Sequence, residues 1–131
     1  DYCLQCCSLT KAKLMKKNKF GRIINFTTVA SPLSLEGEAI YSSIKSGVEK
    51  LTSVLSKELG EFGITVNSIG PNPIKTSLMR TVPADKVKAL FDKQVFKRYG
   101  DFEDISNVID FYISQKSKFI TGQKLFLGGV S

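Results

Sequence analysis

The sequence contains no histidine and no tryptophan, and its three cysteines, Cys3, Cys6 and Cys7, all lie within one short N-terminal stretch. Without histidine, one chain cannot form a Ser-His or Cys-His nucleophile pair, and three cysteines are too few for a four-ligand Cys/His zinc site. The i, i+4 spacing of Cys3 and Cys7 is also typical of the buried side of a helix, an interpretation that we favour over a zinc site shared between chains. We therefore expect no metal site.

Long hydrophobic runs are also lacking. No apolar run approaches the roughly 18 residues of a membrane-spanning helix, and the first residues, DYCLQCC, lack the zones of a signal peptide. The 131 residues are 42% hydrophobic, which suffices for one folded domain, and no repeat or linker divides residues 1–131. We therefore expect a single-domain, soluble cytoplasmic protein that does not bind membranes.

Positive charge dominates, with a formal net charge of +7. Six cationic residues lie near the start: Lys11, Lys13, Lys16, Lys17, Lys19 and Arg22. Such a cluster can attract nucleic-acid phosphates or an acidic carrier protein, although a solvated helix face is the simpler interpretation. Because no nucleic-acid-binding motif accompanies the cluster, we expect no nucleic-acid partner; binding that weakens steeply with salt would indicate the contrary.

Strand and helix patterns alternate along the chain. The periodicity predicts helices over 2–17, 39–60, 83–94 and 101–114, and strands over 22–29, 64–69 and 123–129. Helical crossovers between strands indicate a parallel α/β sheet. The chain has no initiator methionine, begins inside a predicted helix and supplies only three strands. We therefore expect it to be the second half of a larger domain.

Apolar stripes indicate which helix faces are buried. Asp101 is the expected N-cap of its helix, and Gly60 and Gly63 are expected to end the longest helix. The predicted buried residues are Leu4, Cys7, Leu14 and Met15 in the first helix, Ile40, Ile44, Val48, Leu51, Leu55 and Leu59 in the longest, and Ile105, Val108, Ile109 and Tyr112 in the last.

Tyr41 and Lys45 are the first candidate for chemistry. Residues at i and i+4 of a helix lie one above the other, so both side chains can reach one pocket. A phenol ordinarily titrates near a pKa of about 10, and a neighbouring ammonium stabilises the phenolate and lowers that pKa. The pair can then perform acid-base chemistry near neutral pH. Tyr-x-x-x-Lys alone is common by chance, and a buried tyrosine next to a solvated lysine remains the alternative.

Two further segments are predicted to converge on this pair. Thr28 ends a buried strand in NFTTVAS, and the loop IGPNPIKTSLM follows the next strand. The carboxyl ends of strands in open parallel sheets are where such folds place ligands. The Thr28 hydroxyl there could bond a substrate carbonyl and polarise it. Thr27 is expected to point to the other face of the sheet.

These segments resemble, in order and spacing, the C-terminal half of short-chain dehydrogenases/reductases, most closely the 3-oxoacyl-acyl-carrier-protein reductase type. The resemblance covers essentially the whole chain, through GRIINFTTVAS, YSSIKSGVEKLTSVLSKELGEFGITVNSIGP, IKTSLM, the helix over 101–114 and ITGQKLFLGG. It implies the C-terminal half of a Rossmann-type, doubly wound parallel sheet. It also implies an NAD(P)-dependent enzyme that reduces a carbonyl to an alcohol, with NADP favoured over NAD.

The resemblance assigns roles to individual residues. It implies that Tyr41 is the general acid, that Lys45 assists it and bonds the nicotinamide ribose, and that Thr28 stands in for the family's catalytic serine. The implied cofactor-binding residues are Tyr41, Lys45, Pro71, Asn72, Ile74 and Thr76, and residues 77–96 would form a substrate lid. The small residues Ser42, Ser43, Ser46 and Gly47 would allow close packing against the sheet and a partner helix, in a homotetramer or homodimer.

The sequence departs from the family pattern at three places. Thr28 keeps the hydroxyl but adds a methyl group that restricts χ1. Asn72 replaces the glycine of a Pro-Gly turn, and asparagine tolerates positive φ better than most residues. The Gly-rich turn, the residue that selects the cofactor and the catalytic asparagine do not occur in these residues, so we expect the 131 residues alone to be inactive.

We expect the substrate to be a 3-oxoacyl thioester, either small or bound to an acyl carrier protein, whose acidity would suit the basic surface. A sugar or another small ketone is the alternative substrate. A non-catalytic oligomerisation or interaction domain derived from the family is the alternative function, and the changes at Thr28 and Asn72 favour it.

Overall fold

The computed structural model describes residues 11–76, 79 and 82–130. Residues 11–18 are helical, and the elements that follow are β1 (Gly21–Phe26), α2 (Ala30–Leu33), α3 (Ala39–Leu59), β2 (Ile64–Gly70), α4 (Ala84–Asp92), α5 (Phe102–Ile113) and β3 (Lys124–Phe126). Two single-turn 3-10 helices, η1 (Gly60–Phe62) and η3 (Gln115–Ser117), follow α3 and α5. Every predicted strand and helix has a counterpart in the described residues, with bounds that differ by at most three residues, except that residues 2–10 of the predicted first helix lie outside the described residues.

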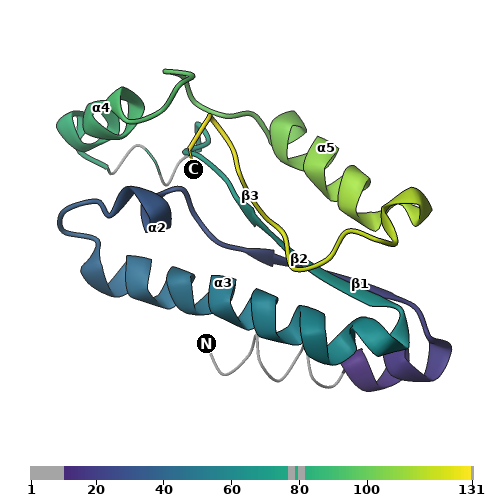
Figure 1. Cartoon of the computed structure of the whole chain (residues 1–131). Helices are drawn as coiled ribbons and strands as arrows, with labels where there is room; N and C mark the ends of the chain where they lie inside the picture. The colour runs from purple at the N-terminus through teal and green to yellow at the C-terminus, as the bar shows by residue number, and fades with distance from the viewer. Residues whose placement is uncertain (1–10, 77–78, 80–81, 131) are drawn as a thin grey trace.

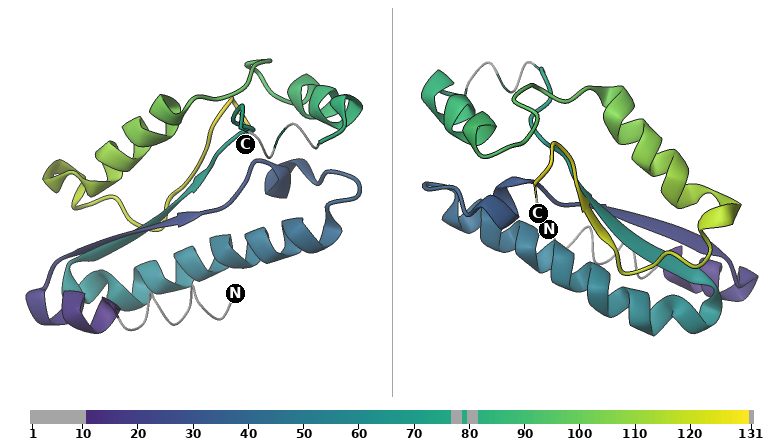
Figure 2. Two further views of the ribbon diagram at one scale, coloured as in Figure 1. Left: turned by 180° about the vertical axis from the view of Figure 1, so that it is seen from behind. Right: turned by 45° about the horizontal axis from the view of Figure 1, so that its top comes forward.

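The three strands form one parallel sheet in the order β1-β2-β3. Figures 1 and 2 show α3 on one face of this sheet and α5 on the other, while α2 and α4 lie beyond the carboxyl ends of the strands. All seven residues of β2 are buried, as expected for a central strand covered on both faces. The predicted α/β class, with helices on both faces of a parallel sheet, is confirmed.

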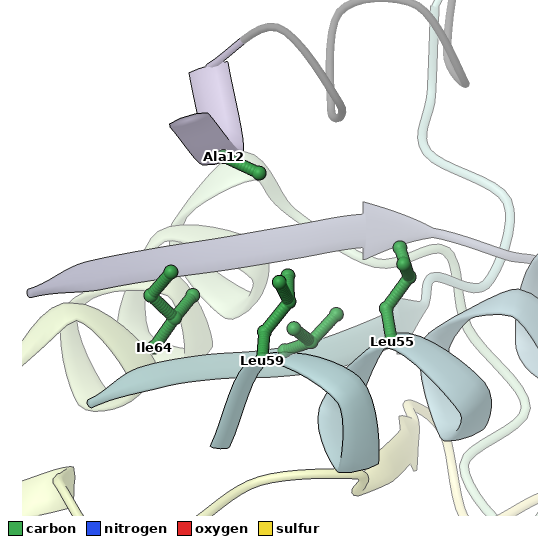
Figure 3. Close-up of a cluster of buried hydrophobic side chains, with 5 residues drawn as sticks. Ala12, Leu55, Leu59 and Ile64 are labelled. Carbon is green, nitrogen blue, oxygen red and sulfur yellow. The ribbon is translucent and has the colours of Figure 1, made fainter. Parts of the chain in front are cut away.

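The main hydrophobic cluster lies between α3 and the sheet. Its buried members are Ala12, Leu55, Leu59, Ile64 and Val66. Figure 3 shows Leu55 and Leu59 directed from α3 toward the strands. A second cluster, formed by Val29, Leu90 and Val130, lies at the carboxyl end of the sheet, where it supports α4.

The predicted buried stripe of α3 is correct only in the C-terminal half of the helix. Ile40 is 80% exposed and Ile44 is 46% exposed, because the N-terminal half of α3 extends past the strands and lies alongside α2 (Figure 1). Leu14, another predicted core residue, is 65% exposed. The predictions for Leu4 and Cys7 fall outside the described residues.

Two of the predicted helix ends are confirmed. Asp101 and Asp104 form a reciprocal capping box at the start of α5. Gly63 adopts a φ of 68°, and its N–H donates to the Gly60 carbonyl in the turn that leads into β2. Within the described ranges, no helix combines the length and the apolar character needed to cross a membrane.

Candidate active site

Tyr41 and Lys45 lie in the exposed N-terminal half of α3, next to the carboxyl end of β1. The Lys45 ammonium lies 5.9 Å from the centre of the Tyr41 ring and donates a 3.1 Å hydrogen bond to the carbonyl of Phe26, the last residue of β1. Tyr41 is 45% exposed, so its phenol can be reached from outside. The predicted proximity of the two side chains is confirmed, and the sheet fixes the position of the ammonium.

Thr28 follows β1 directly. The Thr27 N–H donates to the Ile69 carbonyl at 2.8 Å, which extends the ladder with β2 by one residue, and the Ala30 N–H donates to Thr28 Oγ1 at 3.3 Å. Thr28 and Tyr41 line the same cavity, as predicted. Lys45 is not one of the lining residues, so the prediction that both side chains reach one pocket is correct only for Tyr41.

This large cavity has a volume of about 740 Å³ and opens at the carboxyl end of the sheet. Its walls come from the turn after β1, the N-terminal turn of α3, the loop after β2, and α4. Its larger apolar lining residues include Leu35, Met79, Val82, Val87 and Leu90, and its charged ones are Glu36, Glu38, Asp85, Lys86 and Lys93. The arrangement suits an apolar substrate that enters past a charged rim.

The structure brings only part of the predicted cofactor loop to this cavity. Pro71 and Asn72 line it. Ile74 instead forms a parallel bridge with Gly100, in which the Gly100 N–H donates to the Pro73 carbonyl at 2.9 Å. The Thr76 carbonyl accepts a hydrogen bond of 3.1 Å from the Met79 N–H. Cofactor contacts by these residues remain predictions.

Asn72 does not use the backbone freedom that the family glycine has. Among the described non-glycine residues, only Lys19 and Ser34 have a positive φ. Asn72 therefore does not adopt the left-handed conformation considered above, and its side chain is buried, at 7% exposure.

Glu49 is a buried partner that sequence reasoning missed. The Thr27 hydroxyl donates a 2.7 Å hydrogen bond to Glu49 Oε1, and Lys124 Nζ lies 3.7 Å from Glu49 Oε2. The Thr27 hydroxyl thus points to α3, and Thr27 and Thr28 both contribute to the lining of the large cavity. The spacing of α3 places Glu49 on the same side as Lys45, but it does not indicate that Glu49 meets Thr27, so no sequence signal could have found this contact.

The serines of α3 fasten it to α2. The Ser42 hydroxyl donates to the Ala30 carbonyl at 3.3 Å, and the hydroxyls of Ser46 and Ser31 lie 2.8 Å apart. Small side chains at these two positions thus have a role within the chain. Ser43 and Gly47 are exposed, and contact with a partner helix remains a prediction for them.

Arg98, Asp101 and Asp104 form a charged cluster at the start of α5, separate from the large cavity. A backbone hydrogen bond from Asp101 and, less strongly, the Arg98 side chain hold the pKa of Asp104 below its ordinary value. Among the residues that the structure describes, no group of three or more histidine, cysteine, aspartate or glutamate side chains is arranged to hold a metal ion.

A three-stranded parallel sheet with helices on both faces is the architecture expected for half of a Rossmann-type domain. A family model described as "Enoyl-(Acyl carrier protein) reductase" matches residues 2–130. The chain belongs to the short-chain dehydrogenase/reductase family.

Several curated proteins are similar to the chain. It is 34% identical over 115 residues to the 3-oxoacyl-[acyl-carrier-protein] reductase FabG of Staphylococcus epidermidis, covering 88% of this chain and 47% of that protein. It is 38% identical over 115 residues to the (2S)-[(R)-hydroxy(phenyl)methyl]succinyl-CoA dehydrogenase subunit BbsD of Thauera aromatica, covering 88% of this chain and 46% of that protein. The chain therefore spans about half the length of the curated relatives that it matches.

A solved structure supports the fold. A crystal structure of a protein described as a gluconate dehydrogenase from Agrobacterium tumefaciens superposes with a TM-score of 0.83 at 25% identity, covering 90% of this chain and 47% of that one. The similarity matches the predicted C-terminal half of the family fold.

Proposed function

We propose that the full-length gene product that carries these residues is an NAD(P)-dependent reductase of 3-oxoacyl thioesters. The observation that carries this proposal is that Thr28 and Tyr41 line one cavity of about 740 Å³ while Lys45 lies next to the Tyr41 ring. Two relatives support this substrate class, because their names describe substrates that are thioesters. One is the 3-oxoacyl-[acyl-carrier-protein] reductase FabG, and the other is the (2S)-[(R)-hydroxy(phenyl)methyl]succinyl-CoA dehydrogenase subunit BbsD.

Each of the three side chains has a distinct part in the proposed reaction. The Thr28 hydroxyl donates a hydrogen bond to the substrate carbonyl and orients it. Tyr41 transfers its phenolic proton to the carbonyl oxygen, which becomes the hydroxyl of the product. The Lys45 ammonium, fixed by its bond to the Phe26 carbonyl, stabilises the negative charge that remains on the tyrosine oxygen.

The nicotinamide, when bound, supplies the hydride that reduces the carbonyl carbon. The residues present suit the nicotinamide end of such a cofactor, because Pro71 and Asn72 share the cavity with Tyr41. Which dinucleotide binds, NADP or NAD, is left to experiment.

The large cavity also agrees with the proposed substrate. Its apolar lining suits an acyl chain, and its rim carries the basic side chains Lys86 and Lys93 beside acidic ones. A sugar ketone is the second candidate substrate, and the similarity to a protein described as a gluconate dehydrogenase favours it. An apolar lining suits a polyhydroxylated sugar less well.

We also propose that the protein assembles as a homo-oligomer. The support is the exposed apolar side chains on α3, which include Ile40, Ile44 and Val54. Exposed apolar side chains gathered on one helix often mark an interface. Light scattering of the full-length gene product should give a dimer or tetramer mass, and a monomer would contradict this part of the proposal.

The test follows NADPH and NADH oxidation by the full-length gene product, with acetoacetyl-CoA and with a keto sugar as substrates. We expect turnover of the thioester, and Tyr41→Phe should lower kcat by about a hundredfold or more while dinucleotide binding persists. Wild-type turnover in Tyr41→Phe would contradict the role of the phenol. Dinucleotide binding without turnover of either substrate would favour a non-catalytic domain.

A further inference from the structure

The Asn72 amide is directed toward the segment that joins α4 to α5. Its Nδ2 donates a long hydrogen bond, 3.5 Å, to the Arg98 carbonyl. Asn72 also lines a second, smaller cavity of about 210 Å³, whose other lining residues are Phe96, Arg98, Asp104, Asn107, Leu127 and Gly128. The residue thus separates the large cavity from this smaller one and contributes to the wall of each.

Gly100 leaves the space that the Asn72 amide occupies, whereas a Cβ on Gly128 would lie at ordinary van der Waals distance from the amide. A Cβ atom on Gly100 would collide with the Asn72 side chain. A Cβ on Gly128 would lie 3.6 Å from Asn72 Nδ2 and 3.1 Å from Oε1 of the buried Gln94. Gly100 does not have a positive φ, so the space around it, rather than its backbone conformation, requires glycine. The absence of a side chain at Gly100 therefore leaves the space that the Asn72 side chain fills.

The segment that Asn72 contacts is itself held in place. The N–H groups of Val95 and Phe96 both donate to the Gly128 carbonyl, at 3.0 and 3.2 Å. Arg98 Nη1 lies 3.2 Å from Asp104 Oδ2, and the same carboxylate caps α5. Asn72 thus connects the loop after β2 to a segment fixed by β3 and α5, and that segment continues directly from α4 of the large cavity.

We propose that Asn72 is a positioning residue: its side chain, packed against Gly100, sets where the Pro71–Thr76 loop lies against the nicotinamide end of a bound dinucleotide. This inference rests on the proposed function. The family glycine has no side chain with which to do this. The Asn72 side chain therefore holds the Pro71–Thr76 loop from the side of the α4–α5 segment, and the position of the loop depends on the space at Gly100.

Calorimetric titration of the full-length gene product tests the role, with the intact dinucleotide and with the corresponding ADP-ribose, which lacks nicotinamide. Asn72→Gly and Gly100→Ala should each weaken binding of the intact dinucleotide about three- to tenfold, the effect of one lost polar contact, and leave ADP-ribose binding unchanged. The double variant should bind about as Asn72→Gly alone does, because the methyl group on residue 100 collides only with the Asn72 side chain, which the double variant lacks. Asn107→Ala, a matched change in the smaller cavity, should have no effect.

Thermal melting identifies variants that fold poorly. If Asn72→Gly melts early, Asn72→Ala replaces it, because alanine removes the amide without loosening the backbone. Equal weakening for both ligands, no weakening, or additive losses in the double variant would each overturn the positioning role. A wild-type protein that binds neither dinucleotide would refute the proposed function and this role together, whereas binding with normal behaviour in the variants refutes only the role.

Discussion

Glu49→Ala is expected to destabilise the sheet edge that carries Thr28. Glu49 is nearly buried, since its side chain is 13% exposed, and it accepts the 2.7 Å hydrogen bond from the Thr27 hydroxyl. A hydrogen bond to a charged group contributes about 1.5–3 kcal/mol. The Lys124 ammonium is 42% exposed and 3.7 Å away, so that ion pair should add less than about 1 kcal/mol.

We therefore expect Glu49→Ala to lower the free energy of unfolding by about 2–3 kcal/mol, measured by urea denaturation of the full-length gene product. Lys124→Ala should cost less than about 1 kcal/mol. Glu49→Gln keeps an acceptor oxygen and should fall between the two. Glu58→Ala, the same change at an exposed position of α3, is the control and should change stability by less than about 0.5 kcal/mol.

The cycle with Thr27→Ala isolates the hydrogen bond. The double variant Thr27→Ala/Glu49→Ala should be less destabilised than the sum of the two single changes, because both remove the same bond. Strict additivity, or a Lys124→Ala loss as large as that of Glu49→Ala, would refute the reasoning. In that case Glu49 would act through charge rather than through the Thr27 hydroxyl.

Two further predictions concern packing and pH. Gly70→Ala should lower the free energy of unfolding by about 1–3 kcal/mol in urea denaturation, because the added Cβ would collide with the Phe126 ring. The control is Gly47→Ala, whose Cβ would meet no described atom within 4 Å and which should be neutral or stabilising. Equal losses in the two variants would contradict the packing argument. The pKa of Asp104 is lowered by folding, so its stabilising contribution is present above 3.8, its ordinary pKa, and is lost as pH falls through the folded value. The stability difference between wild type and Asp104→Asn should therefore be largest at neutral pH and shrink below pH 3.8, and a difference that grows in acid would contradict this assignment.

Local patterns in the sequence predicted the elements and the Tyr41–Lys45 pair. Both depend on short spacings, the helical repeat of α3 and the alternation of strands with helices, which fix local geometry directly. The sequence also predicted that Thr28 and Tyr41 line one cavity, because parallel strands bring their carboxyl ends to one edge of the sheet.

Contacts between distant segments could not be predicted in this way. The bond from Thr27 to Glu49 joins residues 22 apart in the chain, and nothing in the spacing of α3 indicates that a carboxylate on it meets β1. The exposure of Ile40 and Ile44 depends on where the strands end beneath α3, which the helical repeat does not encode. The Asn72 amide contacts Gly100 only because two loops meet, and neither loop has a periodic pattern.

The two departures from the family pattern within these residues bear differently on whether chemistry is retained. At Thr28 the hydroxyl is kept, and the threonine lines the cavity together with Tyr41. At Asn72 the added side chain contacts Arg98 and Gly100, away from Tyr41, so it need not obstruct the ligand. The retained hydroxyl of Thr28 beside Tyr41 favours the catalytic proposal over the non-catalytic alternative. The ligand-specific effect of Asn72→Gly is the measurement that separates the two.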